Sequence, residues 1–377
     1  MTVPKVVIDS AILVTPRLSA LPIELIPIAG RQIGVNDLKD VHALLTRTVT
    51  RVDAHLLQDS RIGFVGTASA GTDHIDTRYL SEHAISLASA AGCNAAAVAD
   101  YVLDAIYQCG RLESLISGAT VGLVGYGAVG RQLATRLVRL GAIVKVYDPL
   151  IREAAADVHV CSLSEALSCS IVSLHAALHS DEPYPSFQML DSEAAAHVMS
   201  DAVFINAGRG GLVTEEALHR MGDRGVTLVL DAWPDEPNLP SALLSKVAFA
   251  TPHIAGYTAA SKTNATDFLI EPLKRALNLT CALHQTDLGE TRRIVMDLSE
   301  ETDIGGLMTV MAAVTRLAQD DSEFRQSWTR APSPDNFESQ RTNYRLRDQY
   351  SDVTIRVERA STKLQGLLSA LGFDVVT

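Results

Sequence analysis

Short apolar runs alternate with polar segments of helical length through the first two thirds of the chain. These runs are Lys5–Asp9, Ala43–Thr46, Ile62–Thr67, Ile85–Ala88, Thr120–Val124, Ile143–Tyr147, Ile171–His175, Ala202–Asn206, Thr227–Asp231 and Val247–Thr251. Brief runs rich in β-branched residues are typical of buried strands, and their alternation with helices predicts parallel sheets joined by crossover helices. We therefore expect an α/β fold with two Rossmann-like domains.

The last ninety residues show a different pattern, which predicts an α+β piece. Expected strands are Arg292–Asp297, Val353–Val357 and Asp374–Val376, and expected helices are Ile304–Leu317, Asn336–Arg347 and Thr362–Leu371. Asn94–Gln108 is a further, mostly apolar helix. Three domains are expected: residues 1–93 completed by 257–285, residues 94–256, and residues 286–377.

One stretch, Thr120–Asp148, carries the most specific motif. After its first strand, Gly125, Gly127 and Gly130 form G-x-G-x-x-G at the start of a helix, and Asp148 ends the next strand. The glycines allow a tight turn, close approach of a pyrophosphate and packing of helix on strand, and helix N–H groups bind the phosphates. A carboxylate accepts hydrogen bonds from ribose hydroxyls and repels a 2′-phosphate, so Asp148 favours NAD over NADP.

Composition narrows the possible partners. The formal net charge is −12, which argues against a nucleic-acid or anionic-membrane partner because both need a basic footprint. No apolar run approaches the roughly 18 residues of a membrane span, and the N-terminus does not read as a signal peptide. The five cysteines include no C-x-x-C pair, so no metal site is predicted, and we expect a reduced, cytoplasmic protein.

Polar residues cluster at the ends of three strands of the second domain. Arg209 follows Ala202–Asn206, Glu236 lies in the turn after Thr227–Asp231, and His253 follows Val247–Thr251. Each residue alone would be read as a surface, turn or capping residue. Open α/β sheets bind ligands at the carboxyl ends of their strands, so three such groups at three strand ends indicate one site.

These motifs resemble the D-isomer-specific 2-hydroxyacid dehydrogenases. The resemblance rests on Gly125–Gly130 with Asp148, on N-A-x-R-G at 206–210, on D-x-W-x-x-E-P at 231–237 and on T-P-H-I-A-G-Y at 251–257. It implies that His253 is the acid/base, that Glu236 orients it and that Arg209 binds the substrate oxygens. Asp235 is a rival for the orienting role, but the family pattern places the acid directly before Pro237.

The resemblance also implies cofactor and substrate contacts. Asp231 and Gly256 match positions near the nicotinamide of NAD, while Thr48, Ser69 and Tyr257 match substrate-contacting positions. A narrower similarity, in Phe64–His74, Gly92–Ala95, Arg341–Tyr344 and Leu371–Phe373, implies a small anionic phosphorylated 2-hydroxy acid as substrate and a homodimer formed by the C-terminal domain. The catalytic cleft is expected between the first two domains.

Arginines suit phosphate oxygens. We expect Arg47, and a group made of Arg341, Arg345 and Arg347 on one predicted helix, at the substrate phosphate. A solvated helix face is the alternative reading of that group.

Two alternatives to this function stay open. One is another dehydrogenase of the family, for example one acting on 3-phosphoglycerate. The other is an NAD-sensing binding protein on the same scaffold. Ala176, where the family often has Thr-Pro after the histidine, and Thr214, in place of an aspartate, depart from the family pattern.

Overall fold

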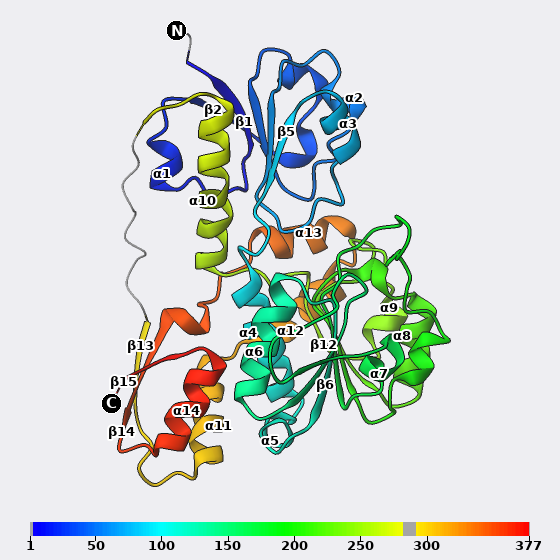
Figure 1. Cartoon of the computed structure of the whole chain (residues 1–377), viewed down its shortest axis with the longest axis vertical. Helices are drawn as coiled ribbons and strands as arrows, with labels where there is room; N and C mark the ends of the chain where they lie inside the picture. The colour runs from blue at the N-terminus through cyan, green and yellow to red at the C-terminus, as the bar shows by residue number, and fades with distance from the viewer. Residues whose placement is uncertain (1–2, 282–291, 377) are drawn as a thin grey trace. The chain divides into compact units, whose positions relative to one another are not determined.

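The computed structural model describes residues 3–281 and 292–376. They form two compact units (Figure 1). The first is built from the chain up to Asn94 and from the segment that starts at Thr258. The second is built from Ala95–Tyr257 and the C-terminal segment that starts with β13. The predicted boundary between residues 285 and 286 lies outside the described residues.

The first unit is built on a parallel five-stranded sheet in the order β2-β1-β3-β4-β5. Its strands are β1 (Lys5–Asp9), β2 (Glu24–Ile28), β3 (Ala43–Thr46), β4 (Phe64–Thr67) and β5 (Ser86–Ser89), and its helices are α1 (Pro16–Ser19), α2 (Ala54–Leu57), α3 (Thr77–Glu82) and α10 (Ala259–Ala276). Sequence reasoning missed β2, which contains Pro27. Proline is tolerated there because β2 is an edge strand. Leu269 and Leu273 of α10 pack into the core beside β1 and β3.

The second unit holds a parallel seven-stranded sheet in the order β12-β11-β10-β9-β6-β7-β8. Its strands are β6 (Thr120–Val124), β7 (Ile143–Tyr147), β8 (Val158–Val160), β9 (Ile171–Leu174), β10 (Val203–Asn206), β11 (Thr227–Leu230) and β12 (Val247–Ala250). Its helices before the C-terminal segment are α4 (Ala95–Gln108), α5 (Leu112–Ile116), α6 (Ala128–Arg139), α7 (Leu163–Leu167), α8 (Glu215–Asp223) and α9 (Ser241–Leu244). The strand order reverses between β6 and β9, which is where doubly wound sheets bind ligands.

Apolar cores cover both faces of this sheet. Neighbouring residues of one strand enter different cores: Phe204 of β10 lies in one and Ile205 in the other. Continuous apolar runs are required because both faces of each strand are buried. Figure 1 shows α4 and α6 on one side of the sheet and α7, α8 and α9 on the other. The predicted α/β class with parallel sheets is confirmed.

The C-terminal segment adds a small parallel sheet in the order β13-β14-β15. Its elements are β13 (Arg292–Asp297), α11 (Asp303–Val314), α12 (Leu317–Arg330), α13 (Pro334–Thr342), β14 (Val353–Glu358), α14 (Thr362–Leu371) and β15 (Asp374–Val376). Leu307, Met311 and Leu368 share a core with Leu133 and Leu137 of α6. The segment is therefore packed against α6 of its own unit.

Two sequence predictions for this segment are wrong. The charged stretch between the two expected helices Ile304–Leu317 and Asn336–Arg347 is itself a helix, α12, with a buried stripe of Leu317, Asp320, Phe324 and Trp328. Helix α13 ends at Thr342, capped by Asn343, and not at Arg347. Because the chain leaves the helix there, Arg341 and Arg345 do not share one helix face. Beyond the end of the helix, Tyr344 and Arg347 instead make tertiary contacts.

Within the described residues, no helix is both long and apolar enough to cross a bilayer.

Candidate active site

The glycine turn after β6 has the geometry that a dinucleotide needs. Gly125 has φ +99°, and a Cβ there would overlap the backbone of Ala176. A Cβ on Gly130 would overlap the carbonyl oxygen of Gly125, so α6 can approach the turn only with glycine here. Gly127 is the N-cap of α6, with no side-chain cap, and open space lies beside its Cα. The uncapped helix start fits a pyrophosphate, which N–H groups would bind.

Asp148 lies beside the same turn. Its Oδ2 accepts a hydrogen bond from the N–H of Tyr126 at 2.8 Å, and its Oδ1 accepts one from Leu150 at 3.0 Å. Each carboxylate oxygen has a second lone pair, so the group retains capacity for ribose hydroxyls. The Arg131 guanidinium lies 4.5 Å from the centre of the Tyr126 ring. The residues at the end of β7 therefore fit the adenosine half of NAD.

The ends of three neighbouring strands, β10, β11 and β12, carry the three predicted catalytic groups. Nδ1 of His253 lies 2.5 Å from Oε1 of Glu236, whose Oε2 accepts the N–H of Trp233 at 3.1 Å. Glu236, and not the exposed Asp235, contacts the histidine. Burial raises the pKa of Glu236, but the charge of His253, its hydrogen bond and the charge of Arg341 together lower that pKa to about 2. The carboxylate therefore stays ionised at neutral pH.

Arg209 stands at the start of a short 3-10 helix, Gly210–Leu212, directly after β10. Its Nη1 donates to the Gly208 carbonyl at 3.2 Å, and its own carbonyl accepts from Asn206 Nδ2 at 3.1 Å. A Cβ on Gly210 would overlap the Trp233 carbonyl, so the loops that bear Arg209 and Glu236 touch backbone to backbone. This packing brings the cation to the same sheet edge as the His253–Glu236 pair.

Asp231 is fully buried at the end of β11, and its carboxylate organises the histidine loop. Oδ1 accepts from Thr251 Oγ1 and from the N–H of Ile254, both at 2.7 Å, and Oδ2 accepts from the N–H of Ala255 at 2.8 Å. The predicted nicotinamide contact of Asp231, like that of the partly buried Gly256, stays a prediction.

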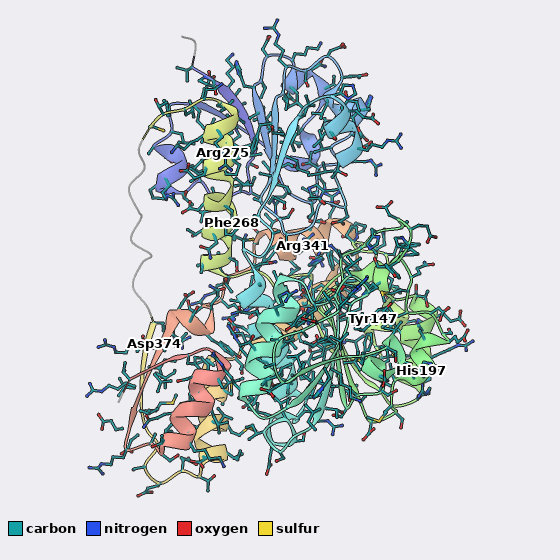
Figure 2. The ribbon with its side chains drawn as sticks, in the orientation of Figure 1. Tyr147, His197, Phe268, Arg275, Arg341 and Asp374 are labelled. Carbon is teal, nitrogen blue, oxygen red and sulfur yellow. The ribbon has the colours of Figure 1, made fainter. Side chains whose placement is uncertain are left out.

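Arg341, labelled in Figure 2, enters the site from α13. Its Nη2 lies 3.5 Å from Tyr257 Oη and its Nη1 3.4 Å from Glu338 Oε1. Among the described residues its Nε is buried with no hydrogen-bond partner. Within the described residues, the hydrogen bonds of the Arg341 guanidinium are therefore long ones. Its positive charge helps to lower the pKa of Glu236. By contrast Arg345 is exposed, and Arg347 bonds to backbone carbonyls.

The remaining predicted substrate residues belong to the first unit. Arg47 Nε donates to Asp9 Oδ2 at 3.0 Å, and that carboxylate is buried. Thr48 is exposed. Ser69 Oγ lies 2.5 Å from Thr67 Oγ1, whose oxygen also lies 3.2 Å from His74 Nε2. Arg47, Thr48 and Ser69 thus occupy the loops after β3 and β4, at the carboxyl edge of that unit's sheet.

Sequence reasoning missed Tyr101 and Thr251 as supports of this site. Tyr101 Oη bonds Thr251 Oγ1 at 2.7 Å, and Thr251 in turn bonds Asp231. Tyr101 lies in the middle of an apolar helix and has no local motif, so its role depends on a contact across 150 residues.

Comparison with known proteins identifies the family of this chain. The family model for the D-isomer specific 2-hydroxyacid dehydrogenase, NAD binding domain, matches residues 86–255. The chain is 35% identical over 355 residues to an erythronate-4-phosphate dehydrogenase of Marinomonas sp., with 92% of each chain covered. It is 36% identical to one of Marinobacter nauticus, over 92% of this chain and 93% of the relative. The chain belongs to the erythronate-4-phosphate dehydrogenase branch of this family. It is an NAD-dependent dehydrogenase.

A solved structure supports the fold. The NAD-bound 3-phosphoglycerate dehydrogenase of Entamoeba histolytica aligns with a TM-score of 0.63 at 20% identity, over 76% of this chain and 99% of its own. The alignment therefore covers almost all of that neighbour and leaves about a quarter of this chain unmatched. The erythronate-4-phosphate dehydrogenases match over 92% of this chain.

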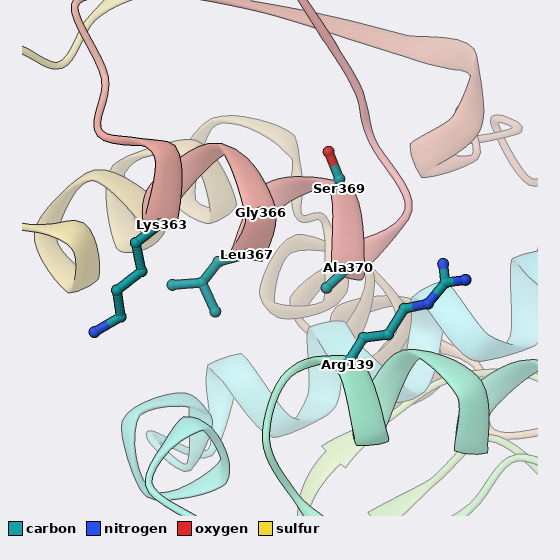
Figure 3. A pocket seen from close by; sticks show the side chains of 6 residues that line it. All are labelled: Arg139, Lys363, Gly366, Leu367, Ser369 and Ala370. Carbon is teal, nitrogen blue, oxygen red and sulfur yellow. The ribbon is translucent and has the colours of Figure 1, made fainter. Parts of the chain in front are cut away.

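A hollow lies in the second unit between α14 and α6 (Figure 3). This open depression of about 440 Å³ is lined by Arg139, Lys363, Gly366, Leu367, Ser369 and Ala370. It includes none of the predicted catalytic or cofactor-binding residues.

Proposed function

We propose that this dehydrogenase oxidises 4-phospho-D-erythronate at C2 to 2-oxo-3-hydroxy-4-phosphobutanoate, a step of pyridoxal 5′-phosphate biosynthesis. The observation that carries the proposal is the 2.5 Å contact of His253 with Glu236 in a chain similar over 92% of its length to erythronate-4-phosphate dehydrogenases. The chemistry needs a base for the hydroxyl proton and a cation for the carboxylate and the developing carbonyl. His253 and Arg209 supply these two groups.

Each residue has one part in the reaction. His253 removes the C2 hydroxyl proton through Nε2, because Nδ1 is bonded to Glu236. The ionised Glu236 stabilises the imidazolium that forms and fixes its tautomer. The Arg209 guanidinium binds the substrate carboxylate and the oxygen that becomes the C2 carbonyl. The glycine turn and Asp148 would hold NAD, which would supply the hydride acceptor for C2.

Substrate phosphate recognition is assigned to arginines. Arg341 is the strongest candidate because its side chain is only 11% exposed, its hydrogen bonds of 3.4 and 3.5 Å are long, and its buried Nε has no partner among the described residues. A substrate phosphate would accept hydrogen bonds from Arg341, whose present hydrogen bonds to Glu338 and Tyr257 are long. Arg47, with Thr48, Ser69 and Tyr257, completes the proposed substrate set.

The experiment is turnover of 4-phospho-D-erythronate coupled to a 2-oxo acid, with unphosphorylated erythronate and 3-phosphoglycerate in parallel. Strong preference for 4-phosphoerythronate supports the proposal. Equal or better turnover of either other acid keeps the dehydrogenase and discards this substrate. Failure to turn over any of them while NADH still binds favours the NAD-sensing alternative.

We further propose a cytoplasmic homodimer joined through the C-terminal segment. One face of the β13–β15 sheet is exposed: Val295 is 57% exposed, Val376 is 38% exposed, and both pair in register with the exposed Arg356. A second copy would bury these valines. Sedimentation of Val295→Lys tests this: a monomer is expected, and an unchanged dimer would place the interface elsewhere.

A further inference from the structure

The backbone at His253 is held in an unfavourable conformation. His253 has φ +57°, in the left-handed region that side chains with a Cβ rarely adopt. Its N–H donates to the Asp231 carbonyl at 2.9 Å, and the next two N–H groups donate to the Asp231 carboxylate. Such a conformation persists only when its surroundings fix it, and Asp231 supplies one side of that support.

Arg347 supplies the other side. Its Nη1 donates to the Ile254 carbonyl at 3.1 Å, and its Nη2 donates to the Ala255 carbonyl. The same Nη2 donates to the Ala97 carbonyl of α4 at 2.7 Å, and the guanidinium carbon lies 5.8 Å from the centre of the Tyr101 ring. Ile254 and Ala255, the two residues after His253, therefore have their N–H groups bonded to one charged side chain and their carbonyls to another.

The chain on both sides of Arg347 is anchored. Tyr344 Oη donates to Asp320 Oδ2 of α12 at 2.7 Å, and the N–H of Tyr350 donates to Asp100 Oδ2 of α4 at 2.9 Å. Asp100 is also paired with Arg136 of α6. These contacts fix the backbone from which Arg347 reaches the histidine loop. Arg347 lies beyond residues 86–255, the range that matches the NAD-binding domain model.

We propose that Arg347 is a positioning residue for His253, through which the C-terminal segment holds the catalytic imidazole against Glu236. Lysine cannot replace it fully, because a single ammonium lacks the planar fork that reaches three carbonyls from fixed directions. Loss of the fork lets the Ile254–Ala255 peptides move, and His253 moves with them. This inference rests on the proposed role of His253, and it holds for whichever 2-hydroxy acid the enzyme turns over.

The test compares Arg347→Lys with Arg347→Gln, each in the wild-type and the Glu236→Gln background. Arg330→Lys is the matched control, because Arg330 is an exposed arginine at the end of α12 in the same segment. In the wild-type background we expect kcat to fall by about 10- to 100-fold, since small displacements of a catalytic group have such costs. KM for NAD should rise less than kcat falls, because the glycine turn and Asp148, which would bind the rest of the cofactor, do not touch Arg347 even though the predicted nicotinamide contact Gly256 follows the loop that it holds.

The double variants separate positioning from general structural support. If Arg347 acts by holding His253 against Glu236, most of its effect should disappear once Glu236 is glutamine, so the two losses are not additive. Equal fold losses in both backgrounds, a loss confined to KM for NAD, or wild-type kcat in folded Arg347→Lys and Arg347→Gln would overturn the inference. Should Arg347→Gln not fold, Arg347→Lys alone decides, because lysine keeps the charge beside Asp100 and Asp320. If the wild-type enzyme shows no turnover, the proposed function fails. Wild-type turnover is therefore measured before any variant is assayed.

Discussion

His253 and Glu236 come from the ends of neighbouring strands, β12 and β11, and their Nδ1 and Oε1 atoms lie 2.5 Å apart. The short contact matters for catalysis because an ionised carboxylate stabilises the imidazolium formed when a hydroxyl proton is removed. The environment of Glu236 keeps its pKa near 2, so the pair keeps its negative partner over the whole working range of pH.

Glu236→Gln should therefore lower kcat by about 10- to 100-fold, within the range of general acid–base effects. Glutamine can keep a hydrogen bond to Nδ1 but cannot stabilise the charged ring. Asp235→Asn is the matched control, because Asp235 is the exposed neighbour in the same turn, and it should retain wild-type kcat. Steady-state kinetics decides between them. A larger loss in Asp235→Asn would give the orienting role to the other acid.

Arg209→Lys should raise the substrate KM and lower kcat, with kcat/KM falling by about 10- to 100-fold. That range corresponds to the roughly 1.5–3 kcal/mol of a charge-assisted hydrogen bond. Binding of NADH, followed by fluorescence titration, should stay unchanged. Arg220→Lys, an exposed arginine on α8 that pairs with Glu216, controls for the substitution itself. Unchanged kcat/KM in Arg209→Lys would remove Arg209 from the substrate site.

The parts of this molecule differ in how well the sequence predicts them. The glycine turn, Asp148 and the three strand ends are local: each functional residue follows its own strand, and parallel strands bring their carboxyl ends to one edge. Arg209, Glu236 and His253 could therefore be chosen before the fold was known. The order β10-β11-β12, which places them side by side, agrees with consecutive crossover connections.

The C-terminal contributions could not be predicted in the same way. Arg341 reaches Tyr257 across 84 positions, and Arg347 reaches Ala255 across 92. Neither sequence separation produces a periodic signal, and the expected long helix wrongly included Arg347. The end of α13 at Thr342 depends on tertiary partners, Asp320 for Tyr344 and the carbonyls for Arg347. Local helix propensity was overruled by these contacts.

Asp148→Ser should weaken discrimination between NAD and NADP. The serine removes the negative charge that repels a 2′-phosphate, and the exposed Arg152 lies four residues further on. We expect KM for NAD to rise about tenfold, the loss of one charge-assisted hydrogen bond, and measurable activity with NADP to appear. Because Asp148 also holds the Tyr126 N–H, thermal stability should be measured in parallel. An unchanged NAD/NADP ratio of kcat/KM would contradict this role.

Asp104 should make stability depend on pH. It lies buried on α4, its Oδ2 accepts the N–H groups of Arg316 and Leu317 at 3.2 Å, and among the described residues its Oδ1 has no partner. Burial, together with the negative charge of Asp320, raises the pKa of Asp104 to about 7. The two backbone hydrogen bonds and the positive charge of Arg347 lower that pKa but offset the rise only in part. Since this pKa is above the unfolded value of 3.8, the protonated carboxyl stabilises the fold fully below that value. That contribution is lost as pH rises through about 7.

Asp104→Asn keeps an acceptor for α12 and removes the ionisation. At pH 8 the variant should be more stable than the wild type, by at most about 4 kcal/mol for a shift of roughly three pH units. At pH 5 the difference should shrink to roughly 1.6 kcal/mol, because the carboxyl is then ionised in the unfolded chain but protonated in the folded protein. Fluorescence reports the right unit, because both tryptophans, Trp233 and Trp328, belong to it. The exposed Asp335→Asn is the control and should show no pH-dependent difference. A variant less stable than the wild type at pH 8 would mean that the negative charge of Asp104 stabilises the start of α12, which contradicts a pKa raised by burial.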